Sequence, residues 1–286
     1  MAVAGMAGLP PAWHVATTFQ PLYSVHATTL VGFEALARPV SSSGEPVGPA
    51  DFLATRTEAG IPRVDREWRR GHLARFASVD EGVGLLHLNI HPKALAGDAI
   101  EELHDDIALH GLAPSRVCLE ILEAPAPDES RLARTAAACR ALGMQVAIDG
   151  FGIAHSNIDR VARIGPDLVK IHRPALDAAA GPDLSRRILP SLVGLLHEAG
   201  VQVVVSGLGD VTSALCAVEA GADVVQGFYF GAPRPGLLPD PMATELLCRL
   251  KRLRGTGAGP YGGDEEPEFT RPQRQPAGDP APDVAG

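Results

Sequence analysis

The sequence lacks the features that mark secreted, disulfide-bonded or membrane-spanning proteins. It has only four cysteines and no C-x-x-C pair, so we interpret them as small buried hydrophobic residues in a reducing compartment. No apolar run approaches the roughly 20 residues that a membrane-spanning helix needs. Residues 1–11 contain no basic residue ahead of an apolar segment, which argues against a secretory signal. We therefore expect a cytoplasmic protein.

An excess of positive charge is also missing. The chain carries 25 Lys and Arg against 34 Asp and Glu, for a formal net charge of −9. This balance argues against DNA binding through a basic surface, although a local cluster or a metal ion can still hold a small anionic ligand. The 286 residues, of which 45% are hydrophobic, suit one large domain, because α/β barrels commonly occupy about 200–250 residues.

Short apolar runs alternate with longer amphipathic segments over residues 13–254. Eight runs are nearly continuous apolar stretches, as in strands covered on both faces. These predicted strands are Phe19–Ser24, Leu30–Ala37, Gly84–Ile90, Val117–Leu122, Gln145–Ile148, Leu168–Ile171, Val201–Val205 and Val224–Phe230. Four segments between them carry helix start and stop signals, such as Asp210 as an N-cap and Gly143 after a helix. These predicted helices are Ala50–Ala59, Asp128–Leu142, Leu184–Ala199 and Val211–Ala220.

Repeated strand–helix units predict an α/β fold with a mainly parallel sheet. About eight units in about 240 residues predict a closed (β/α)8 barrel of the TIM type, formed by a single domain. An open doubly wound sheet is the alternative, and the absence of a G-x-G-x-x-G turn after an early strand disfavours it. We expect an N-terminal tail (1–12), the barrel (13–254) and a disordered C-terminal tail (255–286), because the last segment is rich in Gly, Pro and Glu.

Polar residues end most of the apolar runs. In a β/α barrel, the carboxyl ends of the strands and the loops after them form the active site. The polar residues are Glu34, Asn89, Glu120, Asp149, Lys170, Ser206 and Gln226. Any one of them alone is explained by an ion pair or a cap, but clustered carboxylates repel one another unless a cation lies between them. Together they predict an acidic barrel mouth that binds a hard divalent ion such as Mg²⁺ or Mn²⁺.

The same residues lie in six short motifs. They are Gly32–Arg38 preceded by Gln20-Pro21-Leu22, His87–Ile90, Leu119–Glu123, Ile148–Gly152, Asp167–Ile171, and Gln226–Phe228 followed by Pro233. In this order, they resemble the E-A-L, asparagine-strand, E-x-x-E, D-D-F-G, D-x-x-K-I and Q-G-[YF]…P motifs of the EAL family of cyclic di-GMP phosphodiesterases. The resemblance covers nearly all of the predicted folded part.

The resemblance implies a barrel that hydrolyses cyclic di-GMP to the linear dinucleotide with two Mg²⁺ or Mn²⁺ ions. By position, the first ion would be held by Glu34, Asn89, Glu120 and Asp149. Lys170 would position or deprotonate the attacking water, and nearby cations would lower its pKa.

Further roles follow from the same resemblance. Glu34 and Lys170 are assigned to catalysis together with Glu123, which would brace the loop after Asp149. Arg38 would contact a substrate phosphate through its guanidinium group. Gln20 and Gln226 are assigned to substrate binding, and Gln226 would also support the water and the metal site.

The sequence departs from the family pattern on one half of the site. Gly150 replaces the second Asp of D-D-F-G, and Ser206 and Gly209 replace two glutamates. His172 stands where K-I-D has its Asp, and Gly152–Ala154 form a stiffer loop than the family's flexible one. Because hard cations depend on charged oxygen ligands, we expect the second metal to be weakened or lost. A loss of several kcal/mol at about 1.4 kcal/mol per tenfold would slow turnover by orders of magnitude.

The C-terminal tail contains a second, misleading motif. Gly262-Gly263-Asp264-Glu265-Glu266 mimics the signature of diguanylate cyclases. We reject that interpretation, because the signature belongs to a hairpin inside a complete α/β domain and no predicted strand surrounds it here.

Three functions remain open from the sequence. The chain is a cyclic di-GMP phosphodiesterase with weakened activity, a receptor that binds cyclic di-GMP without cutting it, or an interaction protein that contacts a partner through the barrel or the C-terminal tail. All three belong to bacterial second-messenger signalling. The resemblance also implies a homodimer.

Overall fold

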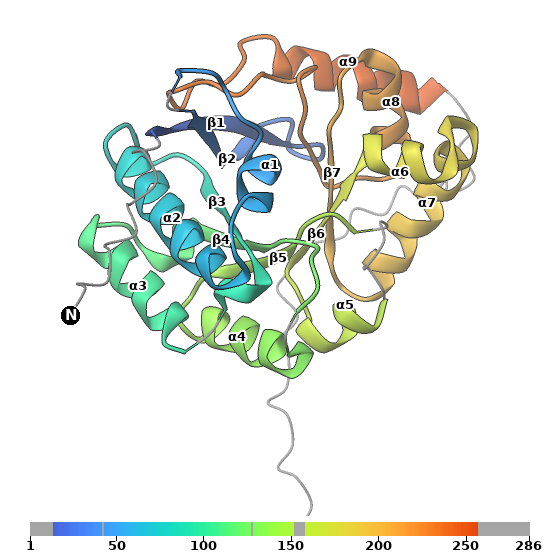
Figure 1. Ribbon diagram of the computed structural model, residues 1–286. Helices are drawn as coiled ribbons and strands as arrows, with labels where there is room; N and C mark the ends of the chain where they lie inside the picture. The colour runs from blue at the N-terminus through green and yellow to red at the C-terminus, as the bar shows by residue number, and fades with distance from the viewer. Residues whose placement is uncertain (1–13, 42, 96, 127, 152–157, 257–286) are drawn as a thin grey trace, which may run out of the picture.

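The computed structural model describes residues 14–256, except 42, 96, 127 and 152–157. Eight strands form one closed barrel in chain order, and helices surround it (Figure 1). The predicted (β/α)8 barrel is therefore confirmed. The predicted N-terminal tail, the remodelled loop Gly152–Ala154 and all but the first two residues of the predicted C-terminal tail lie outside the described residues.

The strands agree closely with the apolar runs of the sequence. They are β1 His14–Ser24, β2 Leu30–Val40, β3 Leu85–Ile90, β4 Val117–Ile121, β5 Gln145–Ile148, β6 Leu168–His172, β7 Gln202–Ser206 and β8 Val224–Val225. β1 runs antiparallel to both of its neighbours, β2 and β8, and the other neighbours are parallel. The connection from Ser24 to Leu30 is too short for the crossover that parallel strands require, so β1 and β2 form a hairpin.

The predicted strand Val224–Phe230 was wrong in its length, because β8 ends at Val225. The chain then turns, and the N–H groups of Phe230 and Gly231 both donate to the carbonyl of Gly227. A Cβ atom on Gly227 would lie 2.1 Å from the carbonyl oxygen of Leu208, so this close approach requires glycine. The apolar pattern continues past the strand because Tyr229 and Phe230 still pack on the core, whereas Phe228 is exposed.

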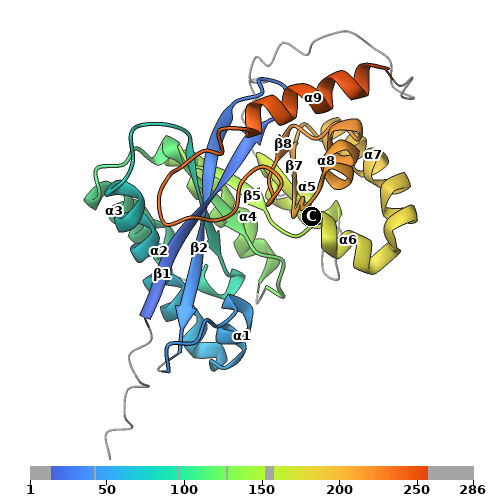
Figure 2. The ribbon, with the colours of Figure 1, turned by 90° about the horizontal axis from the view of Figure 1, so that it is seen from above.

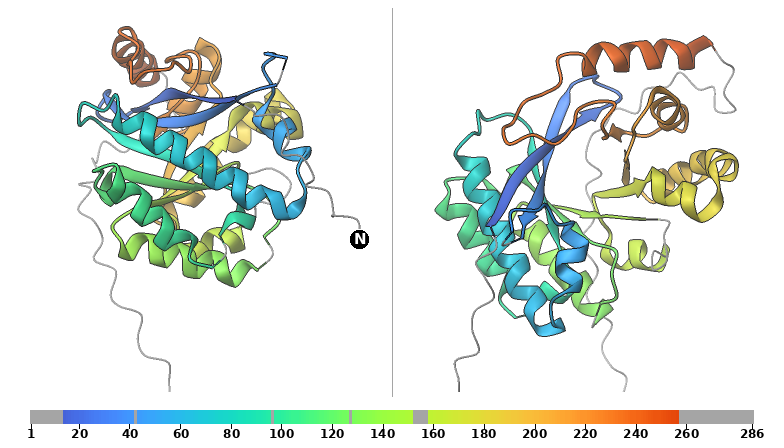
Figure 3. Two further views of the ribbon diagram at one scale, coloured as in Figure 1. Left: turned by 60° about the vertical axis from the view of Figure 1, so that its left-hand side comes forward. Right: turned by 45° about the horizontal axis from the view of Figure 1, so that its top comes forward.

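Nine helices surround the barrel in the described part of the chain. They are α1 Pro49–Ala54, α2 Ile61–Ala77, α3 Ala99–Leu109, α4 Glu129–Ala141, α5 Ile158–Ile164, α6 Arg173–Ala180, α7 Pro182–Glu198, α8 Val211–Glu219 and α9 Ala243–Thr256. α2, α3 and α4 lie side by side outside the barrel (Figure 3). α9 lies near the β1–β2 connection (Figure 2), where Lys251 donates to the carbonyl of His26 at 2.8 Å. None of these helices is both long and apolar enough to span a bilayer.

The four predicted helices correspond to α1, α4, α7 and α8. Asp210 caps α8 as predicted, because its carboxylate accepts the backbone N–H of Ser213 at 2.8 Å. The predicted helix Ala50–Ala59 was too long. α1 ends at Ala54, where the Thr55 hydroxyl donates to the carbonyl of Phe52, and a separate 3-10 turn follows.

The barrel interior has two layers, which arise from the period of two along each strand. The lower layer is apolar apart from His87, and its apolar members are Leu22, Cys118, Ala147, Leu168, Val204 and Val224. Two residues further along the parallel strands, the chain presents Glu120, Asp149, Lys170, Ser206 and Gln226. β1 runs in the opposite direction, so Gln20 precedes Leu22 and still lies at the same level as Glu34. The apolar layer therefore supports a polar layer at the carboxyl ends of the strands.

A buried histidine on the outside of the barrel predicts a pH-dependent stability. His72 of α2 is hydrogen-bonded to Thr17 of β1 at 2.8 Å, and burial followed by the charge of Arg69 lowers its pKa from 6.5 to about 4. Between these values the unfolded state binds more protons than the native state, so stability is lost as the pH falls below 6.5. We expect this group to cost about 2 kcal/mol of unfolding free energy between pH 7 and pH 5.

Urea unfolding of the wild type and of His72→Gln at both pH values measures this effect. The substitution removes the titrating ring, so the variant is expected to lose less stability on acidification. Equal losses in the two proteins would contradict the assignment.

Candidate functional site

The polar layer converges on the ammonium group of Lys170. Its Nζ lies 2.8 Å from Glu120 Oε2, 3.0 Å from Glu34 Oε2 and 3.9 Å from Asp149 Oδ1. Lys170 is 2% exposed and Glu120 is fully buried. Asp167, the acidic residue nearest to Lys170 along the chain, instead accepts a hydrogen bond from a backbone N–H of β5. Four predicted site residues from four strands or strand ends are thus brought together.

Two amide side chains donate hydrogen bonds to Glu34, and a third amide supports one of them. Asn89 Nδ2 donates to Oε1 of Glu34 at 2.8 Å, and Gln226 Nε2 donates to Oε2 at 2.7 Å. Gln226 Nε2 also lies 3.5 Å from Gln20 Oε1, and Gln20 donates to the carbonyl of Gly231 at 3.1 Å. The predicted substrate-binding glutamines therefore orient Glu34 in this structure.

Burial and charge act against each other in this cluster. Burial favours the neutral form of Glu120, but Lys170 and a hydrogen bond from His87 outweigh it and lower the Glu120 pKa to about 2. Burial favours neutral Lys170, but Glu120, Glu34 and Asp149 outweigh it and raise the Lys170 pKa well above its ordinary value. Bound cations would oppose that increase, which is the direction expected from the sequence. Burial raises the Asp149 pKa to about 7, against the effect of Lys170.

The donor set fits a hard divalent ion in its chemistry. Glu34, Glu120 and Asp149 supply carboxylate oxygens. The amide oxygen of Asn89 is buried and has no hydrogen-bond partner among the described residues, which leaves it available as a ligand. Within the same residues, no three His, Cys, Asp or Glu side chains are arranged around a common ion position. The carboxylates face the Lys170 ammonium instead, so an ion must share them with that group.

A pocket of about 350 Å³ opens above the cluster. Its lining includes Gln20, Glu34, Asp149, Lys170 and Gln226 from the predicted site, together with His172, Ser206, Gly207 and Phe228. Ser206 and Gly207 add no charged group to the pocket lining. The carboxylates of the lining are Glu34 and Asp149, which both belong to the predicted first metal site. Phe228 is 70% exposed, which presents an apolar ring at the pocket.

Arg38 and Glu123 lie at the edges of this arrangement. Arg38 is half-buried on β2, on the same strand face as Glu34, and its Nη1 donates to the carbonyl of Ala37 at 3.1 Å. Burial lowers the Arg38 pKa, while Glu34 opposes the change. Glu123 packs against Gly150, where an added Cβ would lie 3.1 Å from Glu123 Oε2. Glu123 therefore contacts the turn after Asp149, where the resemblance places it.

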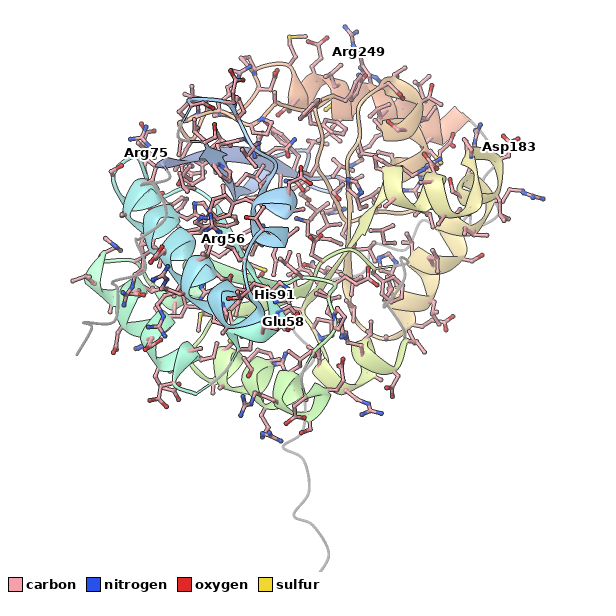
Figure 4. All side chains as sticks on the ribbon, in the orientation of Figure 1. Arg56, Glu58, Arg75, His91, Asp183 and Arg249 are labelled. Atoms are coloured by element: carbon pink, nitrogen blue, oxygen red, sulfur yellow. The ribbon has the colours of Figure 1, made fainter. Side chains whose placement is uncertain are left out.

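The histidines near the strand ends differ in their surroundings. His172 lines the pocket at the end of β6, and burial and Lys170 lower its pKa. His91 is half-buried near Glu58 (Figure 4), and its Nδ1 accepts the backbone N–H of Lys93 at 3.1 Å. Its own backbone N–H donates to Asp65. His91 therefore stabilises the turn after β3 rather than the pocket.

His87 is a site residue that the sequence analysis did not assign. Its Nδ1 lies 2.7 Å from Glu120 Oε1, inside the barrel. Its spacing could have indicated this position. His87 precedes Asn89 by two residues, so both side chains lie on the same face of the strand. Within the motif His87–Ile90, the resemblance predicts a role for Asn89 alone.

Comparison with known proteins places this geometry in a family. The model of the EAL domain matches residues 12–233. The chain belongs to the EAL domain family. An uncharacterised protein of Azorhizobium caulinodans is 32% identical over 249 residues, which cover 79% of this chain. The EAL chain spans only 32% of that relative's length.

Two further similar proteins are connected with cyclic di-GMP. Cyclic di-GMP phosphodiesterase RocR of Pseudomonas aeruginosa is 27% identical, over 76% of this chain and 57% of RocR. The crystal structure of YkuI of Bacillus subtilis, in complex with cyclic di-GMP and calcium, has a TM-score of 0.73 and 27% identity, over 85% of this EAL chain and 61% of the YkuI chain.

Proposed function

We propose that this EAL-domain chain hydrolyses cyclic di-GMP to the linear dinucleotide by metal-assisted cleavage, with weakened activity. The convergence of Glu34, Glu120 and Asp149 on Lys170 at the pocket carries the proposal, because a displacement at phosphorus needs charge neutralisation and a positioned nucleophile. RocR, a phosphodiesterase, and YkuI, which binds cyclic di-GMP and calcium, support the choice of substrate.

Each residue has a role in this proposal. Glu34, Asn89, Glu120 and Asp149 would hold a Mg²⁺ or Mn²⁺ ion. When bound, such an ion stabilises negative charge on the reacting phosphate oxygens. Lys170 holds a proton at Nζ beside the carboxylates and would orient the attacking water.

The remaining roles concern binding and support. Arg38 would hold a phosphate through its guanidinium fork. Gln20 and Gln226 keep Glu34 in place, and Gln226 would also contact the water. Glu123 would brace the turn at Gly150.

The weakened activity is inferred from the predicted second metal position, where Gly150 and Ser206 replace carboxylates. Gly150, with a φ of 84°, has no side chain and therefore offers no oxygen ligand. Ser206 offers only a neutral hydroxyl at the end of β7. A second ion would find fewer charged ligands than the first.

Turnover tests the proposal. The purified protein is incubated with cyclic di-GMP and excess Mg²⁺ or Mn²⁺, and the linear dinucleotide is quantified by chromatography. We expect slow product formation that Glu34→Ala abolishes. Absence of product from folded wild type would reject hydrolysis, and product that persists in Glu34→Ala would place the chemistry elsewhere.

Restoring a carboxylate on β7 is expected to increase the rate. Ser206 is nearly buried and lines the pocket, so Ser206→Glu adds a charged oxygen ligand where the cavity has room. We expect about a tenfold increase in Mn²⁺-dependent kcat, equivalent to about 1.4 kcal/mol. Ser206→Gln has the same length without the charge and serves as the control. An equal change in both variants would show that size, and not charge, is responsible.

A receptor that binds cyclic di-GMP without cutting it is the second candidate. The uncharged wall formed by Ser206 and Gly207 favours it, since binding needs only the first half of the site. Calorimetry of the wild type with cyclic di-GMP and Ca²⁺ distinguishes this case. Tight binding without turnover would establish the receptor, and no binding would reject it.

A further inference from the structure

His87 occupies a fixed place between two strands that carry site residues. It lies on β3, opposite Glu34 of β2 in the strand register, and it is 2% exposed. Its Nδ1 is 2.7 Å from Oε1 of Glu120, on β4. A carboxylate oxygen accepts hydrogen bonds, so the imidazole Nδ1–H is the donor of this contact.

The neighbouring strand has a gap that fits this ring. Gly32 of β2 lies against the imidazole, and a Cβ atom there would be 3.2 Å from Cδ2 of His87 and 3.3 Å from its Nε2. Few real contacts are that close, so a larger residue at position 32 would push on the ring. Glycine at this position is required first by the carbonyl oxygen of Leu85, which would lie 2.7 Å from such a Cβ atom, and it also leaves room for the imidazole.

The two oxygens of Glu120 consequently have different partners. Oε1 accepts the His87 N–H, and Oε2 contacts Lys170 Nζ at 2.8 Å. A carboxylate held at both oxygens cannot rotate freely, so Oε2 stays directed at the cluster with Glu34. Without His87, Oε1 would be buried without a partner, and the group would turn to regain one.

We infer that His87 is a positioning residue that orients Glu120 for a divalent cation at the barrel mouth. Partners that orient metal ligands contribute roughly 10–100-fold to metal affinity. The inference rests on the proposed function for the identity of the site, and it concerns the affinity for the ion and not the chemical step. His87 is not among the described residues that line the pocket.

Mn²⁺ affinity, measured by calorimetry without nucleotide, tests the inference. We expect His87→Leu to bind Mn²⁺ at least tenfold more weakly than the wild type. His87→Asn is expected to recover most of the affinity, because its amide nitrogen stands where Nδ1 was. His87→Gln moves the donor further along the side chain and should recover less. His72→Leu is the matched control, since it removes another buried histidine outside the barrel and should not change Mn²⁺ affinity.

The outcomes separate this inference from the proposed function. A folded His87→Leu variant with wild-type Mn²⁺ affinity would overturn the inference, as would a wild type that binds no Mn²⁺. If His87→Leu does not fold, equal affinities of the Asn and Gln variants would overturn it. Mn²⁺ binding that depends on His87, in a protein that ignores cyclic di-GMP, would support the inference and reject the proposed function.

Discussion

Replacing Lys170 by methionine is expected to lower the free energy of unfolding by about 3–5 kcal/mol. The substitution keeps much of the side-chain volume but removes the ammonium group that contacts Glu120 and Glu34 at 2.8 and 3.0 Å. Both carboxylates are buried, so each would be left as an uncompensated charge. Urea unfolding at pH 7, with Lys170→Met beside the wild type, measures the loss.

Two further proteins make the test specific. Lys93→Met removes an ion pair with the exposed Glu58 and is expected to cost less than about 1 kcal/mol. Lys170→Met combined with Glu120→Gln removes one unpaired charge and should regain part of the stability. A Lys170→Met protein as stable as the wild type would show that the ammonium does not neutralise the cluster.

Replacing Asp149 by asparagine is expected to reduce turnover by 100-fold or more while leaving stability unchanged or slightly higher. Asp149 is the most exposed carboxylate of the cluster and the furthest from Lys170 Nζ, at 3.9 Å. Burial raises the pKa of Asp149, and the charges of Glu120 and Glu34 raise it further. The folded protein therefore gains little from the charge, whereas a hard cation needs a charged oxygen.

Thermal unfolding of Asp149→Asn measures its stability, and the chromatographic assay measures its turnover. Asp159→Asn, which changes an exposed acidic residue paired with Arg163 on α5, is the control and should change neither quantity. An Asp149→Asn variant with wild-type turnover would remove Asp149 from the proposed site. A large loss of stability would show that its charge supports the fold.

The strands were predictable because strands buried on both faces are nearly continuous apolar runs. The errors came where neighbouring chain segments decide the structure. β8 ends early because Gly227 must pack against Leu208, which no local pattern reveals. α2 was not predicted because its buried face includes Asp65, Arg69 and His72, which interrupt the apolar stripe. Those polar residues are buried because they find partners on β1, on the turn after β3 and within α2 itself.

The site was predictable in its members and not in its contacts. Polar residues at successive strand ends must meet at one end of a parallel barrel, so Glu34, Glu120 and Lys170 could be grouped from the sequence. The partners of Lys170 could not, because Asp167 is the acidic residue nearest to it along the chain, whereas Glu120 and Glu34 are far away in sequence. Gln20 lies on the antiparallel β1, where it lines the pocket and is a neighbour of Gln226, a contact that the sequence pattern does not reveal.

The two-layered interior separates residues that the fold requires, in the apolar layer, from residues that can change without loss of the fold, at the barrel mouth. The apolar layer fills the barrel, and substitutions there would create cavities or clashes that weaken the whole domain. The mouth residues lie two positions further along and do not fill that layer, so a serine at position 206 or a glycine at position 150 leaves it intact. A barrel built in this way can lose or regain a chemical step through substitutions such as these two while its apolar layer is unchanged. The apolar layer therefore preserves the ancestry of such a chain, and the residues at the barrel mouth determine its present activity.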